Sequence, residues 1–73
     1  MGDSEEVLVD ARGHKCPVPT LRLRRALEGV GSGTVVRLLA DDPMARIDVP
    51  HFCSQQGLEL LEAAETTFRV RKR

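Results

Sequence analysis

The final eight residues, TTFRVRKR (66–73), alternate between apolar and charged side chains. Successive side chains of a strand point to opposite faces, which places Phe68 and Val70 inward and Arg69 and Arg71 toward water. A sheet with one apolar and one polar face needs only a single covering layer of helices. At 73 residues the chain is long enough for one small domain of this two-layer kind.

Three further segments are predicted to be strands. The first is EVLVD (6–10), which ends in the turn-forming residues DARG. The second, TVVRLLA (34–40), is rich in β-favouring residues and places three apolar side chains on one face: Val36, Leu38 and Ala40. The third, LELLEA (58–63), joins the final strand through a tight connection.

The first predicted helix follows Cys16. Its apolar residues recur at i, i+3, i+4 and i+7, which is the spacing of one helix face: Leu23, Ala26, Leu27 and Val30. Pro17 and Pro19 suit its first turn, because no intrahelical bond is lost there with the missing N–H. Gly29 or Gly31 can end this helix.

The second predicted helix runs from about residue 44 to residue 56, with Asp42 as its N-cap and Gly57 as its C-cap. Its apolar positions again follow helical spacing: Ala45, Val49, Phe52 and Cys53. Pro50 contradicts a straight helix. We expect either a kink at Pro50 or a new helix start near Asp48.

The resulting order is β-α-β-α-β-β, with both helices on the same side of the sheet. We therefore predict the α+β class: a two-layer α/β sandwich in which a four-stranded mixed sheet carries two helices on one face. Residues 1–5 are predicted to form a flexible N-terminus, and residues 6–73 a single domain.

Charge and composition argue against several function classes. Eleven basic and eleven acidic side chains cancel, so the net charge supplies no long-range attraction to nucleic acid or membrane. Phe52 and Phe68 are the only aromatic residues, too few for a base-stacking surface, and we do not expect direct binding of nucleic acid. The sequence also lacks a secretory signal and a membrane-spanning apolar run. We expect a cytoplasmic protein with reduced thiols and no membrane partner.

The segment GHKCPVP (13–19) contains Cys16, a candidate reactive residue. This residue lies just before a predicted helix start, where unpaired N–H groups and the helix dipole favour negative charge. Arg12, His14 and Lys15 add positive charge nearby, which favours the nucleophilic thiolate. The residues therefore predict a lowered pKa for the Cys16 thiol, while a small buried thiol remains the alternative.

Cys53 lies on the apolar side of the second predicted helix, so we expect it in the core. The triplets HKC and HFC together supply two histidines and two cysteines. However, residues two positions apart, such as His51 and Cys53, point to different sides of a helix, and neither spacing matches a zinc pattern. We predict no metal site, and without a glycine-rich phosphate loop ahead of a helix we predict no cofactor.

The chain from VDARGHKCPVP through LADDPMARIDVPHFCSQQGLELL to the last strand resembles the TusA family of sulfur carriers, also called SirA-like. Its main motif, Cys-Pro-x-Pro, is matched by Cys16, Pro17 and Pro19, and the preceding Asp10 and Gly13 also fit. The resemblance implies a βαβαββ sandwich and a cysteine that carries sulfur as a persulfide.

In that role Cys16 would receive sulfur from a cysteine desulfurase or a rhodanese-like donor and pass it to an acceptor protein. The family serves tRNA thiolation, cofactor sulfuration and sulfur oxidation. We expect a monomeric carrier, a sulfurtransferase-type relay rather than a multi-turnover enzyme on its own. His14 departs from the apolar residue that family members often have at its position.

Three groups of residues would support this role. Pro17 and Pro19 would shape the turn. The basic residues before the cysteine would stabilise the persulfide anion and help to dock partners: Arg12, His14 and Lys15. The arginines of the first helix would face partners: Arg22, Arg24 and Arg25.

Two other functions stay open on the residues alone. One is a non-catalytic regulatory or interaction module in which Cys16 only packs. The other is an RNA-binding domain, suggested by two clusters of basic residues and by the similarity of the implied fold to the C-terminal domain of translation initiation factor three.

Overall fold

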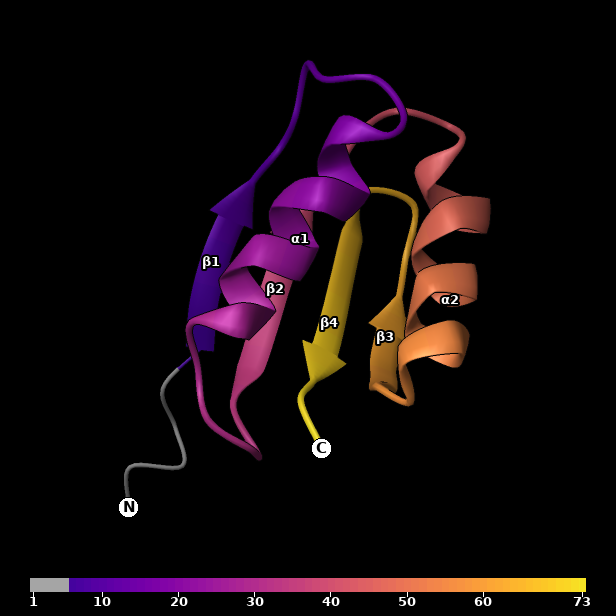
Figure 1. The fold of residues 1–73 in the computed structure, drawn as a ribbon. Coiled ribbons are helices and arrows are strands. Elements are labelled where there is room, and N and C mark those ends of the chain that lie inside the picture. Colours follow the sequence, from indigo (N-terminus) through magenta and orange to yellow (C-terminus); the bar gives the residue numbers. More distant parts are fainter. Residues whose placement is uncertain (1–5) are drawn as a thin grey trace.

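The computed structural model describes residues 6–73 (Figure 1). The elements follow the predicted order: β1 (Glu6–Asp10), α1 (Val18–Glu28), β2 (Val35–Leu39), α2 (Ala45–Gln56), β3 (Glu59–Ala63) and β4 (Thr67–Arg71). The N-terminal segment predicted to be flexible, residues 1–5, lies outside the described residues. Within residues 6–73 no helix has the length and apolar character needed to cross a membrane.

The four strands form one mixed sheet in the order β1-β2-β4-β3. β1 and β2 are parallel, while β4 runs antiparallel to both of its neighbours. Both helices cover the same face of the sheet (Figure 1). The predicted α+β sandwich is therefore confirmed, and the last strand in sequence occupies a central place in the sheet.

The core lies between this face of the sheet and the helices. Phe68 and Val70 of β4 and Val36 and Leu38 of β2 are fully buried, as their alternation predicts. The helices contribute the other side of the core with five residues: Leu23, Leu27, Ala45, Val49 and Cys53. The opposite face of the sheet carries ion pairs, such as Arg69 with Glu6 at 2.6 Å.

The start of α1 matches the expected use of the prolines. Pro17 is the N-cap residue, and Pro19 is buried in the first turn. The helix ends at Gly29, whose N–H donates to the Ala26 carbonyl, and the Val30 N–H donates to the Leu27 carbonyl. The two prolines thus lie where a missing N–H removes no intrahelical bond.

The start of α2 differs from the prediction in two respects. The helix is one continuous element through Pro50, so the expected new start near Asp48 is wrong. Pro50 removes only the N–H that would reach the Arg46 carbonyl, and Arg46 is exposed. Asp42 is not the N-cap, which is Met44. One carboxylate oxygen of Asp42 instead bonds to the Met44 N–H, and the other turns toward a different loop.

Candidate functional site

The loop from β1 to α1 carries Cys16 and lies beside the loop from β2 to α2. Because β1 and β2 are parallel neighbours, their carboxyl ends meet at one edge of the sheet. The Ala11 N–H donates to the Leu39 carbonyl at 2.8 Å and continues this pairing past the end of β1. Two segments far apart in sequence are thereby brought together around the cysteine.

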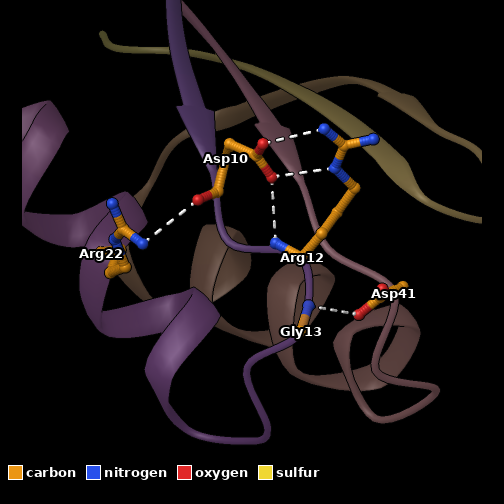
Figure 2. Close-up of polar contacts among 5 residues, drawn as sticks. All are labelled: Asp10, Arg12, Gly13, Arg22 and Asp41. Atoms are coloured by element: carbon orange, nitrogen blue, oxygen red, sulfur yellow. Dashed lines mark hydrogen bonds and ion pairs between the residues drawn. The ribbon is translucent and has the colours of Figure 1, made fainter.

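Gly13 makes the turn that this loop requires. Its φ of 85° is left-handed, a conformation that a side chain disfavours. Its N–H donates to Asp41 Oδ1 at 2.9 Å, a bond between the two loops (Figure 2). Gly13 therefore supports the site through its backbone, which gives a physical reason for glycine at this place in the motif.

Asp10 and Arg12 form a closed ion pair at the base of the loop (Figure 2). The Arg12 side chain donates to both carboxylate oxygens of Asp10 at 2.9 Å, and the Arg12 N–H donates to one of them at 3.1 Å. Arg22 of α1 donates to the Asp10 carbonyl at 3.1 Å. Arg12 and Arg22 therefore brace the loop, and both side chains are also exposed at the surface.

Cys16 itself is exposed and held by two aspartates. Its N–H donates to Asp42 Oδ2, and its Sγ donates to Asp48 Oδ2, each at 2.6 Å. The peptide bond between Cys16 and Pro17 is cis. The exposure of Cys16 contradicts the alternative in which this thiol only packs.

The predicted lowering of the thiol pKa is wrong. The pKa of Cys16 is raised, first by its hydrogen bond to Asp48, then by partial desolvation and by the negative charges of Asp48 and Asp42. Ionisation would remove the donated proton and place a second anion against the carboxylate. Arg12 does not offset this effect, because its guanidinium is bound to Asp10.

The remaining predicted site residues are more dispersed. His14 and Lys15 are exposed beside Cys16. Arg24 pairs with Glu28 at 3.5 Å on α1, and Arg25 lines a shallow hollow with Leu8 next to β1. Arg22 lines the same hollow and bonds to the last residue of β1, directly before the cysteine loop.

Three aspartates of the site were not predicted as functional residues: Asp41, Asp42 and Asp48. The first two follow β2, just as Cys16 follows β1. A parallel pairing of these strands would have brought the two segments together, and this was the signal available in the sequence. Asp48 gave no such signal, since its contact depends on how α2 packs.

Cys53 is buried in α2, as predicted. Burial raises the pKa of its thiol to about 11. Such a thiol is almost entirely un-ionised at neutral pH, so Cys53 is not a second nucleophile at the surface. Within residues 6–73 no three His, Cys, Asp or Glu side chains are grouped so that they could hold a metal ion.

The basic residues near the C-terminus are engaged within the protein. Arg69 binds Glu6 and Arg71 binds Glu59, each at 2.6 Å. The ammonium group of Lys72 donates to the carbonyl groups of Leu27, in the last turn of α1, and Val30, just after it, each at 2.8 Å. These contacts offset the positive charge that suggested RNA binding.

The pKa of Asp10 is lowered from 3.8 to about 2, chiefly by the hydrogen bond from the Arg12 side chain. A carboxyl group whose pKa is lower in the folded than in the unfolded chain stabilises the fold while it is ionised. This contribution is present above about pH 4 and is lost as the pH falls toward 2.

We therefore expect Asp10→Asn to lower the urea midpoint near neutral pH and to weaken the loss of stability in that acid range, measured by denaturation at several pH values. Glu65→Gln, at an exposed position, is the matched control. Equal pH profiles for Asp10→Asn and wild type would contradict the prediction.

Comparison with known proteins identifies the relatives of this chain. A family model described as sulfurtransferase TusA matches residues 7–72. The sulfur carrier protein TusA of Allochromatium vinosum is 40% identical over 65 residues, covering 89% of this chain and 84% of that protein. TusA of Pseudomonas aeruginosa is 35% identical, with 89% and 82% coverage.

Among solved structures, the crystal structure of a SirA-like protein from Desulfitobacterium hafniense superposes with a TM-score of 0.67 at 30% identity. The match covers 88% of this chain and 90% of that one. Sequence and fold therefore agree over nearly the whole of the described chain, and the chain belongs to the TusA family of sulfur carriers.

Proposed function

We propose that this chain relays sulfur as a persulfide on Cys16. The observation that carries the proposal is the exposed position of Cys16 on a loop fixed from two sides, by Asp10 below and by Asp41 and Asp42 across. Cys53 is buried, with a raised pKa, which leaves Cys16 as the accessible thiol of the described chain.

The relay consists of two exchange steps. In loading, the Cys16 sulfur attacks the outer sulfur of a donor persulfide, the donor S–S bond breaks, and the donor leaves as a thiol that takes up the Cys16 proton. In delivery, an acceptor thiol attacks the outer sulfur on Cys16 in the same way. Each step moves one sulfur atom without net oxidation. Because delivery uses up the carried sulfur and the donor must load Cys16 again, the chain acts as a sulfurtransferase-type relay rather than a multi-turnover enzyme on its own.

The donor in this proposal is a cysteine desulfurase or a rhodanese-like protein, and the acceptor is a second protein of a thiolation, sulfuration or sulfur-oxidation route. The carrier works as a monomer in the cytoplasm, where thiols stay reduced. Exposed apolar residues in the first turns of α1 and α2 and at the N-cap of α2 support docking of such partners: Leu21, Ile47 and Met44. Arg24 and Arg25 are charged partner-facing residues in the same proposal.

The test is a load-and-chase experiment. The carrier is incubated with a cysteine desulfurase and cysteine, separated from the donor, and weighed intact by mass spectrometry. We expect a gain of one sulfur atom, and its loss when an acceptor protein with a free thiol is added. A mass that stays unchanged after incubation with desulfurases and with rhodanese-like donors would contradict the proposal.

A further inference from the structure

Asp48 brings a negative charge directly against the sulfur of Cys16. It is half-buried in the first turns of α2, and its Oδ2 accepts the hydrogen bond from Sγ at 2.6 Å. The two residues are 32 positions apart, so the contact exists only because α2 packs beside the cysteine loop. Such a carboxylate can act as a base, suppress the reactivity of the thiol, or shift the equilibrium of sulfur transfer.

The other charges around the sulfur do not neutralise Asp48. Asp42, on the segment before α2, adds a second carboxylate through its bond to the Cys16 N–H. His14 and Lys15 lie on the cysteine loop itself, and both are exposed to water, which screens the charge of Lys15. Arg12 is bound to Asp10. The immediate contacts of the Cys16 sulfur and its N–H are therefore acidic.

The unloaded and loaded forms of Cys16 respond to this environment in opposite ways. The thiol donates its proton to Asp48, and a hydrogen bond to a charged acceptor is stronger than a neutral one. A persulfide is a stronger acid than a thiol, so the outer sulfur of the loaded form is an anion at neutral pH. An anion cannot donate that bond, and two neighbouring carboxylates repel it.

We propose that Asp48 makes Cys16 a strong sulfur donor, because its carboxylate favours the protonated thiol over the persulfide anion and so shifts the transfer equilibrium toward the acceptor. The inference rests on the proposed role of Cys16 as the sulfur-carrying residue. In the transfer reaction, the persulfide anion of the carrier reacts with the thiol of the acceptor. The products are the thiol of the carrier and the persulfide anion of the acceptor, so atoms and charge balance. The raised pKa of the Cys16 thiol has the same physical origin.

The test is a competition for sulfur between two forms of the carrier. Wild-type protein is loaded by a cysteine desulfurase, freed of donor, and mixed with an equal amount of unloaded Asp48→Asn protein that carries an isotope label. Intact masses then report which protein holds the sulfur, and the experiment is repeated from loaded Asp48→Asn to confirm equilibrium. The loss of one hydrogen bond to a charged group corresponds to an exchange equilibrium constant of about ten in favour of the Asn variant. Because one equivalent of sulfur is shared between equal amounts of the two proteins, the ratio of their loaded forms is the square root of this constant, and we expect the Asn variant to hold about threefold more sulfur than the wild type.

Two further variants separate charge from structure. Asp48→Glu keeps the carboxylate and is expected to share sulfur evenly with the wild type. Asp41→Asn removes a carboxylate that binds the Gly13 N–H rather than the thiol, and it is also expected to share evenly. At acid pH, where the persulfide becomes protonated, the advantage of Asp48→Asn should shrink.

Equal sharing between wild type and Asp48→Asn, or an excess on the wild type, would overturn this inference while leaving Cys16 as the carrier. An equal gain for Asp48→Asn and Asp41→Asn would also overturn it, because the effect would then follow from loosening the loop. If wild-type Cys16 takes up no sulfur at all, the proposed function fails together with the inference.

Discussion

Cys16→Ala is expected to abolish sulfur loading completely and to leave the fold unchanged. Cys16 is exposed, so removal of its thiol opens no cavity in the core. Its Sγ is the atom that would form the bond to the incoming sulfur, and a methyl group offers no electron pair for it. The measurement is the intact mass after incubation with a cysteine desulfurase, with circular dichroism as the check on folding.

Cys53→Ala provides the matched control for this result. Cys53 is buried in α2, so its replacement should cost some stability while one sulfur atom still loads. Loading that persists in Cys16→Ala would remove Cys16 from its proposed role. Loading that disappears in a folded Cys53→Ala variant would contradict the proposal that Cys16 alone is the carrying thiol.

Phe68→Ala is expected to give the largest loss of stability of any single truncation in the core. Phe68 is the largest of the fully buried side chains and lies on the central strand β4. Truncation of a buried phenylalanine costs about 3–5 kcal/mol. Small domains hold about 0.05–0.15 kcal/mol of stability per residue, so this loss takes a large share of the total free energy of unfolding. Urea denaturation followed by circular dichroism measures it.

Phe52→Ala tests whether burial causes this effect. Phe52 is also aromatic, but it lies at the edge of the core between the helices and is only partly buried. We expect a clearly smaller shift in its urea midpoint. Similar midpoints for the two variants would mean that the sheet does not depend on Phe68 as the structure indicates.

The architecture could be predicted from the sequence because burial follows local periods. Phe68 and Val70 alternate with charged residues on β4, and Leu23 and Leu27 follow the helical period on α1. Each of these periods can be recognised from a few neighbouring residues. The continuous course of α2 through Pro50 could not be read in this way, because the cost of a proline in a helix depends on which carbonyl loses its partner.

The electrostatics of the site could not be predicted for a different reason. The charges near Cys16 in sequence predict that Arg12 favours the thiolate, but its guanidinium binds Asp10 instead. The groups that set the thiol pKa are Asp48 and Asp42, which are 32 and 26 residues away. The direction of the pKa shift therefore depends on the tertiary structure, and it is opposite to the direction predicted from the residues next to Cys16 in sequence.

The position of β4 has a consequence for how the site comes into being. The two aspartates that bond to Cys16 precede Thr67 in the sequence. However, β3 joins the sheet only through β4, and β4 pairs with β2, the strand that leads into the aspartate segment. A chain that stops before β4 would contain the cysteine and all its aspartates without a complete sheet to hold α2 against them. We expect the sulfur site and the sheet to form in one cooperative step, so that fragments ending before residue 67 have an ordinary, unrestrained thiol.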